Sequence, residues 1–571
     1  MGDRGFSTRS LRLALGLVTP STPASTSDGW TFADVWEEVA ESIPEAPALV
    51  HGPVRRTWGA FEQRANSVAR FLLDAGCGHQ AKVAFYLHNR PEYSELFFAC
   101  SKASLVHVNT NYRYADDELA YIWDNADTRA VVFQDMFTDT AHRIRSRVPS
   151  IHTWLWVDDG LGSGVCPTWA TSYEDAASLS TSHQTRSTHG RSGDDLVLLY
   201  TGGTTGMPKG VMWRQDDLFT VTDNNNRVSM PDDLDLTAVR GRTTGPGPTS
   251  LPACPLMHGT GLFNAVNTLS LGGSIVTLEG ARFLIDEFLD TLERESVKST
   301  FIVGDAFAKP MLAAIAADPE RWDLSSLRVI ISSGVMWSSE TKQGLLDYFP
   351  QLILVDTYGS SEAVGMGSSV SSKASSAKTA SFSLSPNSAV ISEAGTLVTP
   401  GSGEVGKVGI RGRTPIGYYK DEAKSAATFP VVDGVRYSIP GDFATVEADG
   451  SITLLGRGSV CINTGGEKVF PEEVEEVLKL HPTVADAIVV AVPDDRFGQA
   501  VAAVVSEAEP RSGQLIDSAV IDHVKEHLAH YKAPRRLFTV PSLERAANGK
   551  VDYKRWTAYA ELALDALNRQ P

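Results

Sequence analysis

The chain has 571 residues, of which 42% are hydrophobic and 21% charged, with 51 basic and 69 acidic side chains. This length exceeds what one hydrophobic core supports, so we expect a globular protein with at least two domains. The net charge of −18 argues against binding to nucleic acids or anionic membranes, because phosphate groups attract a surplus of basic side chains.

The cysteines and the apolar segments bear on where the protein works. Its five cysteines are scattered and form no Cys-x-x-Cys pair, which fits neither a disulfide framework nor a zinc site. We therefore expect a reducing, cytoplasmic location. No apolar run approaches the ~18–20 residues of a transmembrane helix. Residues 1–29 hold three arginines and a short apolar stretch with no cleavage site, so we expect a flexible extension rather than a signal peptide.

Helical and strand patterns alternate from Trp30 onward. We predict strands and helices in turn at Lys82–Leu87, Pro91–Ala103, Leu105–Asn109, Glu118–Asn125, Ala130–Phe133, Phe283–Arg294 and Ser299–Val303. This alternation predicts an α/β fold with largely parallel sheets. Three polar stretches, the last of them rich in serine, are predicted to be loops: Ser178–Ser192, Asp223–Ser250 and Gly367–Ser402.

The end of the chain has a pattern of its own, which predicts a small α+β domain. Pro471 begins a predicted helix, with two glutamates beside it at the positive end of the helix dipole. Two strands and a second helix follow at Ala485–Val492, Ala500–Val505 and Ile516–His530. We therefore expect a large domain of layered α/β sheets over residues 30–456, a link over 457–460 and a small mobile domain over 461–571.

A glycine-rich loop within Leu196–Trp213 is the strongest local signal. Glycines let backbone N–H groups close around phosphate oxygens, threonine hydroxyls add donors and a lysine adds charge. The candidate residues are Thr201, Gly202, Gly203, Thr204, Thr205, Gly206 and Lys209. The loop is not a Walker motif, because Pro208 precedes the lysine and Gly210 follows it. An ordinary glycine turn is the alternative.

Two further segments combine a strand with a polar turn. In Val355–Glu362, the ring of Tyr358 is placed to stack on a base and Glu362 to hold Mg²⁺, which prefers oxygen ligands. Ile331–Trp337 is predicted to be a strand followed by a glycine turn, and these residues taken alone indicate only a structural role.

Two turns carry the remaining candidates. Asp442 follows a Pro-Gly turn and is placed to accept hydrogen bonds from a ribose diol, although a turn aspartate often caps its own backbone. Near the end of the chain, an Asn-Gly turn presents Lys550, and a solvated lysine is the alternative there.

In their order and spacing these segments resemble the adenylate-forming superfamily, which includes acyl-CoA synthetases, peptide-synthetase adenylation domains and luciferases. The resemblance extends from about Trp30 to Trp556. Pro415–Lys420 is similar to the superfamily's Gly-Tyr-Tyr segment, and Leu454–Glu475 to its hinge and C-terminal glycine loop. One position departs from the pattern: the superfamily usually has Asp or Lys two residues after the hinge arginine, where this chain has Ser459.

The resemblance implies a reaction in two steps. ATP and a carboxylate give an acyl-adenylate and pyrophosphate, and CoA then displaces AMP to form a thioester. The cofactors implied are ATP, Mg²⁺ and coenzyme A as cosubstrate. Lys550, Glu362 and His258 are the implied catalytic residues, and Thr204 with Glu362 the magnesium ligands. Residues 30–456 become the AMP- and acyl-binding domain, 457–460 the hinge around Ser459, and 461–571 the domain of the catalytic lysine.

The implied binding residues fall into three sets. Those for ATP or AMP are the glycine-loop residues above, with Gly334, Asp356, Tyr358, Gly359, Ser360, Ser361, Asp442 and Arg457. Those facing CoA are Gly465, Gly466, Glu467 and Lys468. The acyl pocket is expected to be apolar, with Met257, Gly261, Phe263, Asn264, Val335, Met336 and Trp337 as candidate walls.

Several identities for the substrate and the activity stay open. Thr201–Gln215 is most similar to bacterial synthetases for long-chain fatty acids or steroid side-chain carboxylates, so a bulky lipid acid ranks first and an aryl acid second. A stand-alone adenylation enzyme that loads a carrier protein is a rival, but Leu271–Ile275 lacks the carrier signature and is interpreted as a strand turn. A regulator that binds nucleotide without catalysing a reaction is a second rival. A homodimer is the one assembly left open.

Overall fold

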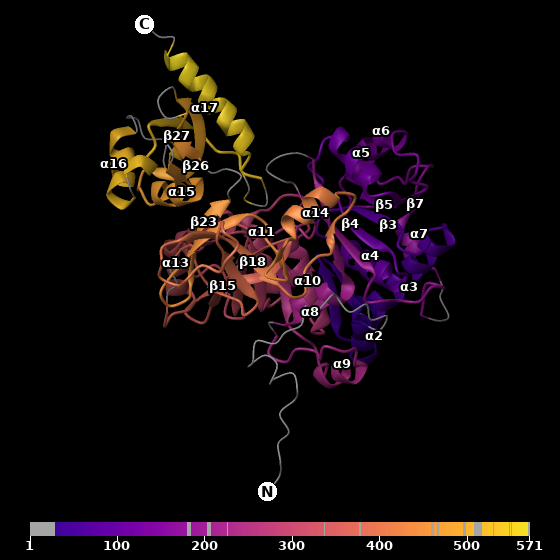
Figure 1. The fold of residues 1–571 in the computed structure, drawn as a ribbon. Coiled ribbons are helices and arrows are strands. Elements are labelled where there is room, and N and C mark those ends of the chain that lie inside the picture. The colour runs from indigo at the N-terminus through magenta and orange to yellow at the C-terminus, as the bar shows by residue number, and fades with distance from the viewer. Residues whose placement is uncertain are drawn as a thin grey trace.

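The computed structural model describes residues 29–179, 184–201, 207–224, 226–335, 337–375, 379–457, 462–464, 467–494, 498–507, 517–528, 530–546, 549 and 551–568. Two β-sheets with helices on their faces form the large N-terminal part of the molecule (Figure 1). A third sheet with three α-helices forms a separate small unit at the C-terminal end of the chain.

The first sheet has eight strands and is parallel through its centre. Its order is β19-β9-β8-β4-β3-β5-β6-β7. Its strands are β3 (Lys82–Tyr86), β4 (Val106–Asn109), β5 (Thr128–Gln134), β6 (Thr153–Val157), β7 (Thr171–Ser172), β8 (Leu196–Thr201), β9 (Lys209–Arg214) and β19 (Gly417–Tyr418). The pairs β8–β9 and β9–β19, at one edge of the sheet, are antiparallel. That edge brings residues 417–418 beside residues 211–212, more than 200 positions earlier in the chain.

The second sheet has fifteen strands and changes from parallel to antiparallel pairing along its length. Its parallel strands are β1 (Pro47–His51), β11 (Ser274–Thr277), β10 (Thr249–Pro252), β12 (Ser299–Ile302), β13 (Val329–Ser333) and β14 (Ile353–Ser360). Its antiparallel strands are β2 (Val54–Thr57), β15 (Ala363–Ser371), β16 (Ser381–Leu384), β17 (Ser388–Ile391), β18 (Val405–Arg411), β20 (Val431–Val432), β21 (Val435–Ser438), β22 (Asp442–Val446) and β23 (Ile452–Arg457). The switch from parallel to antiparallel pairing falls at β14 and β15.

Helices cover both sheets. They are α2 (Phe32–Ser42), α3 (Trp58–Asp74), α4 (Pro91–Lys102), α5 (Asp116–Asn125), α6 (Thr138–Arg145), α7 (Tyr173–Ala177), α8 (Gln215–Asp223), α9 (Leu236–Arg242), α10 (Gly259–Ser270), α11 (Ile285–Arg294), α12 (Asp305–Ala317), α13 (Ser339–Tyr348) and α14 (Glu422–Thr428). The largest apolar core includes Trp30, Trp36, Phe61 and Phe97, and each such side chain contributes roughly 1.5–3 kcal/mol through burial. Within the described part of the chain, no helix has both the length and the apolar character to cross a membrane.

The small C-terminal unit has its own sheet and cores on both faces of it. Its elements are β24 (Ile462–Thr464), β25 (Glu467–Val469), α15 (Pro471–Lys479), β26 (Val484–Asp494), β27 (Gly498–Glu507), α16 (Asp517–His527), β28 (Arg536–Val540) and α17 (Tyr553–Asn568). The rings of Phe443 and Phe470 lie 5.4 Å apart and join β22 to the start of α15. Figure 1 accordingly shows α15 beside β23, with α16 on the outer side of the unit.

The predicted α/β class, with a large domain of layered sheets and a small C-terminal domain, is confirmed. Two of the predicted loops are wrong in part. Residues 223–250 contain α9, whose Asp235 cap accepts a hydrogen bond from the Thr237 backbone. Residues 367–402 contain the end of β15 and all of β16 and β17, because pairing with neighbouring strands orders a serine-rich sequence that has little strand preference of its own.

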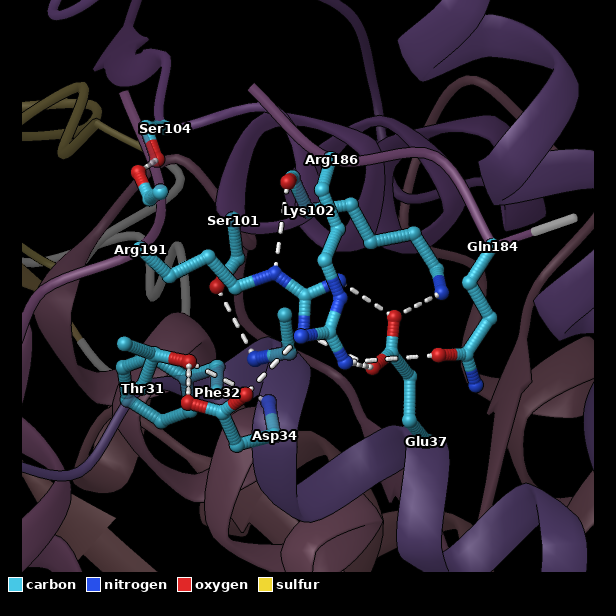
Figure 2. Close-up of polar contacts among 12 residues, drawn as sticks. Thr31, Phe32, Asp34, Glu37, Ser101, Lys102, Ser104, Gln184, Arg186 and Arg191 are labelled. Atoms are coloured by element: carbon cyan, nitrogen blue, oxygen red, sulfur yellow. Dashed lines mark hydrogen bonds and ion pairs between the residues drawn. The ribbon is translucent and has the colours of Figure 1, made fainter. Parts of the chain in front are cut away.

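Buried charges join α2 and α4 to Arg191 (Figure 2). The Lys102 amine donates to Glu37 Oε1 at 2.5 Å and to Glu62 Oε1 at 2.8 Å. The Arg191 guanidinium donates to Glu37 Oε2 at 2.7 Å and to Asp34 Oδ1 at 3.0 Å. The Lys102 side chain is 0% exposed and that of Arg191 4%, so both cations depend on these carboxylates in place of water.

Candidate active site

The glycine-rich loop lies between the end of β8 and the start of β9. Thr201 and Lys209 are cross-strand partners in this antiparallel pair, and residues 202–206, which carry five of the predicted phosphate contacts, lie outside the described residues. The Lys209 amine forms an ion pair with Asp421, just after β19. A cavity of about 300 Å³ opens here, lined by Met207, Lys209, Tyr419 and Asp421 among others.

Tyr358 and Asp442 meet where two parts of the long sheet come together. Tyr358 lies in β14 and is 7% exposed, and its hydroxyl donates to Asp442 Oδ2 at 3.3 Å. Asp442 is the first residue of β22 and pairs across the sheet with Arg457, the last residue of β23. The ring of Tyr358 also lies 5.4 Å from that of Phe382. The predicted adenine and ribose residues are therefore in direct contact.

Glu362 follows the end of β14 and is fixed by several neighbours. The Tyr418 hydroxyl donates to Glu362 Oε1 at 2.8 Å, and the Ser438 hydroxyl donates to its backbone carbonyl at 2.6 Å. Its own N–H donates to Ser360 Oγ at 3.2 Å, and Trp213 Nε1 donates to the carbonyl of Ser361 at 2.8 Å. Strands β9 and β21 thus hold the backbone around Glu362, and Tyr418 of β19 orients its carboxylate.

Asp356 has a different environment from the rest of its segment. It is 5% exposed, and the Lys342 amine on α13 donates to it at 3.2 Å. Burial raises the pKa of Asp356 to about 6, although the charge and hydrogen bond of Lys342 lower it. This buried ion pair favours a supporting role in the strand over a direct contact with nucleotide. Gly359 completes the β14 segment between Tyr358 and Ser360.

The glycine turn after β13 meets the turn that carries the predicted catalytic lysine. Gly334 has a φ of +90°, and Val335 beside it is half-buried. A Cβ atom built on Gly549 would lie 3.0 Å from Val335 Cγ2 and 3.2 Å from Val303 Cγ1. Lys550 itself lies outside the described residues. Its neighbour Gly549 nevertheless belongs to the small unit and is buried against the large one.

A pair of contacts fixes that turn within the small unit. The Arg545 guanidinium forms an ion pair with Asp486 of β26 at 2.6 Å. Arg545 Nη1 also donates to the carbonyl of Gly549 at 3.1 Å. The position of the turn is therefore coupled to the sheet of the small unit, and any rotation of that sheet would carry the turn with it.

His258 caps α10 at its N-terminus and is half-buried. The loop that precedes it is tied to the first sheet, because Asn109 Nδ2 donates to the carbonyls of Tyr200 and Met257 at 2.9 and 2.8 Å. A Cβ atom on Gly261 would lie 2.3 Å from the carbonyl oxygen of Pro255, so a larger residue does not fit there. The α10 terminus is thus held close to the end of β8.

The candidate walls of the acyl pocket are buried to different degrees. Met257 is 2% exposed, and Trp337 is 0% exposed within the core of the second sheet. Phe263, Asn264 and Val335 are half-buried, and Met336 lies outside the described residues. Phe263, Asn264 and Val335 are therefore the better placed of the candidates to meet a substrate.

The link to the small unit begins where β23 ends at Arg457, and Ser459 lies outside the described residues. Beyond it, β24 and β25 form a hairpin in which Thr464 pairs with Glu467 and residue 463 pairs with Lys468. Gly465 and Gly466, which connect these strands, also lie outside the described residues.

The sequence did not reveal four residues that hold this site together. They are Asn109, Tyr418 as the partner of Glu362, Asp421 as the partner of Lys209, and Arg545. The Gly-Tyr-Tyr segment was recognised, but no local pattern states that its first tyrosine reaches a carboxylate 56 positions earlier. Asn109 had a weak signal, as a polar residue at the end of an apolar strand.

Comparison with protein families gives two matches that together span most of the chain. Residues 36–419 match the family described as AMP-binding enzyme, and residues 473–550 match the AMP-binding enzyme C-terminal domain. The chain is 39% identical over 534 residues to a medium/long-chain-fatty-acid–CoA/3-oxocholest-4-en-26-oate–CoA ligase of Mycolicibacterium smegmatis, covering 92% of this chain and 95% of that protein. It is 38% identical over 535 residues to the 3-oxocholest-4-en-26-oate–CoA ligase of Rhodococcus rhodochrous, with the same coverage.

Solved structures show the same fold. The anthranilate CoA ligase AuaEII in complex with anthranoyl-AMP superimposes with a TM-score of 0.81 at 21% identity, covering 94% of this chain and 98% of that one. ATP-bound MatB from Rhodopseudomonas palustris gives a TM-score of 0.76 at 24% identity, covering 93% and 99%. At these identities the likeness concerns the fold.

Proposed function

The chain belongs to the AMP-binding enzyme family, and from this premise we propose that it is an ATP-dependent acyl-CoA ligase for lipid carboxylic acids. The proposed acids are medium- and long-chain fatty acids and steroid side-chain carboxylates. The observation that carries this proposal is the similarity, along 92% of the chain, to ligases named for those acids. An aryl acid or a carrier-protein thiol has no comparable support among these relatives.

The chemistry explains why such an enzyme needs ATP. A free carboxylate is a poor acyl electrophile, because its charge is delocalised and its leaving group would be oxide. Attack of the carboxylate on the α-phosphate releases pyrophosphate and forms a mixed anhydride, from which AMP departs readily when the CoA thiol attacks. Charge builds on the phosphoryl oxygens during the first step, so positioning and electrostatic stabilisation carry most of the catalysis.

We assign the residues of the site to these needs as follows. Thr201, residues 202–206 and Lys209 hold the β- and γ-phosphates, while Tyr358 and Gly334 flank the adenine. Asp442 accepts hydrogen bonds from the ribose. The contact between Tyr358 and Asp442 supports this assignment, because the two groups that receive adjoining parts of one nucleotide lie against each other.

The residues near Glu362 suit a magnesium ion. Glu362 presents a half-buried carboxylate held by Tyr418, and Mg²⁺ prefers oxygen ligands. In this proposal Glu362 and Thr204 bind the ion, which when bound offsets negative charge on the phosphate oxygens. The protein's own part is to fix the direction of the Glu362 carboxylate, which the Tyr418 hydroxyl does.

The proposed division of the chain follows the same logic. Residues 30–456 bind the nucleotide and the acid, 457–460 form a hinge, and 461–571 bring first Lys550 and then the Gly465–Lys468 loop to the site. Gly549 packed against Val335 supports the first of these arrangements. We propose the cytoplasm as the place of action, in keeping with the free thiols of Cys77, Cys100, Cys166 and Cys254.

Thioester formation tests the proposed substrate directly. The purified protein would be incubated with ATP, Mg²⁺, CoA and one acid at a time: octanoate, palmitate, 3-oxocholest-4-en-26-oate or benzoate. We expect acyl-CoA and AMP from one or more of the three lipid acids, at higher kcat/KM than with benzoate. A preference for benzoate would replace the lipid acid by an aryl acid, and adenylate formation without thioester would point to another acceptor.

Replacing Asp442 tests the ribose contact. Asp442→Ala should weaken ATP and AMP binding by similar factors of about 10–100, because both nucleotides carry the same ribose and a hydrogen bond to a charged group contributes roughly 1.5–3 kcal/mol. Calorimetric titration of both nucleotides measures this. Asp449→Ala, in the exposed turn at the far end of the same hairpin, is the matched control. Weaker ATP binding with unchanged AMP binding would contradict the assignment.

Replacing Ser459 tests the hinge. Ser459→Pro fixes φ near about −65° at this position and also restricts Gly458, so the link should reach fewer orientations. We expect adenylate formation to persist while thioester formation falls at least ~10-fold, a barrier increase of about 1.4 kcal/mol. Ser459→Ala, which leaves the backbone free, serves as the control. Equal loss of both half-reactions in a folded protein would mean that the proline misplaces Arg457 rather than restricting rotation.

A further inference from the structure

Three side chains with metal-binding chemistry gather on one face of α16, away from the candidate active site. They are His523, Glu526 and His527, and one ligand atom from each lies within 4.8 Å of the others. Spacings of three and four residues put side chains on the same face of a helix, so the backbone itself brings them together. The segment is on the outer side of the small unit (Figure 1).

The hydrogen bonds of the two imidazole rings determine which nitrogens are available. His527 Nδ1 lies 2.8 Å from the backbone carbonyl of His523, which can only accept, so Nδ1 carries the proton and Nε2 keeps a lone pair. The Nε2 atom of His523 is buried without a hydrogen-bond partner. His527 therefore anchors Nδ1 on the backbone and keeps Nε2 available, and His523 has an Nε2 that no protein group uses.

This arrangement is the one that metal-bound histidines adopt. An imidazole that donates its second N–H to a carbonyl has its orientation and tautomer fixed, and the nitrogen that remains is a better ligand. The unpaired, buried Nε2 of His523 also needs a partner, because a buried polar atom without one is costly. A cation on Nε2 satisfies that atom.

A third histidine lies beside this cluster. The ring of His481, just beyond the end of α15, lies 5.3 Å from that of His523, and the ring of His527 lies 4.4 Å from that of His523.

We propose that α16 binds a divalent transition metal ion of the Zn²⁺ kind through Nε2 of His523, Nε2 of His527 and the carboxylate of Glu526. Two imidazoles with one carboxylate match Zn²⁺, whereas Mg²⁺ favours oxygen ligands alone. Because the folded helix α16 brings the three side chains together, a bound ion would favour the folded small unit over the unfolded chain.

Zinc titration of the whole protein tests the proposal. Protein freed of metal by a chelator would be titrated calorimetrically with ZnCl₂, and separately with MgCl₂. His527→Ala is the informative variant, since His527 is exposed and its loss should leave the fold intact. His530→Ala, an exposed histidine just beyond α16, is the matched control.

We expect the wild type and His530→Ala to bind one equivalent of Zn²⁺ that His527→Ala binds at least ~10-fold more weakly. Glu526→Gln should weaken the same site, and MgCl₂ should not compete for it. Zn²⁺ should also raise the Tm of the wild type but not of His527→Ala. Co²⁺ should give a ligand-field absorption band that the variant lacks. Equal Zn²⁺ affinity in His527→Ala and the wild type, or no saturable Zn²⁺ binding, would overturn the proposal.

Discussion

Lys550→Ala is expected to slow acyl-adenylate formation about 10²–10³-fold while sparing thioester formation from supplied acyl-adenylate. The α-phosphate and the carboxylate are both anionic and must approach each other, and a cation between them lowers the repulsion most in the transition state. Losing one such contact corresponds to roughly 3–4 kcal/mol. The second half-reaction starts from a neutral acyl group, so it does not need this charge.

ATP–pyrophosphate exchange measures the first half-reaction, and CoA-dependent release of AMP from supplied acyl-adenylate measures the second. Lys554→Ala is the matched control, because Lys554 is an exposed lysine four positions further on, within α17. It should behave as wild type in both assays. If exchange in Lys550→Ala stays within about threefold of wild type, the lysine is not the adenylating residue.

The position of Gly549 supports a role for its neighbour Lys550 in the active site. The Asn-Gly-Lys turn was recognisable as a motif, yet an exposed lysine near the end of a chain is usually just solvated. Gly549 is instead buried against Val335 and Val303, beside the Gly334 turn assigned to adenine. Within the small unit, Arg545 forms an ion pair with Asp486 and donates a hydrogen bond to the Gly549 carbonyl.

Local patterns predicted those parts of the fold whose structure depends on neighbours in sequence. The alternation of apolar strands and amphipathic helices located β3, α4, β4 and α15 to within a few residues, because burial on one face sets the period. The glycine turns and the Pro-Gly-Asp turn were equally visible. Each of these features is determined by residues that are consecutive in the sequence.

Contacts between distant segments were not predictable in this way. Tyr418 contacts Glu362 and Asp421 contacts Lys209, and neither pair leaves a local trace. Asn109 bridges Tyr200 and Met257, and its position at the end of an apolar strand does not predict either partner. The serine-rich stretch 367–402 failed for the same reason. Its strands exist because β15 pairs with β14 and β17 pairs with β18, so the partner strand rather than the local composition decides the outcome.

The buried charges of Figure 2 lead to the largest stability effect that we expect, for Glu37→Ala. Glu37 accepts hydrogen bonds from Lys102 and Arg191, whose side chains are 0% and 4% exposed. Without this carboxylate, Glu62 and Asp34 are left to offset two buried cations. Removing one partner of a buried ion pair costs roughly 3–5 kcal/mol, because the remaining charge is neither hydrated nor paired.

Urea unfolding of Glu37→Ala and the wild type measures this loss. Glu41→Ala is the control, because Glu41 is an exposed glutamate on the same helix and its replacement should change the free energy of unfolding by less than about 0.5 kcal/mol. The effect should also depend on pH. Although burial raises it, hydrogen bonds from Arg191 and the charge of Lys102 hold the pKa of Glu37 below its usual value. A lowered carboxyl pKa contributes stability above the unfolded value of about 4.3, and that contribution disappears as the pH falls through the folded value. The difference in the free energy of unfolding between Glu37→Ala and the wild type should therefore be largest at neutral pH and smaller in acid. An equal difference at both pH values would mean that Glu37 acts through packing rather than through its charge.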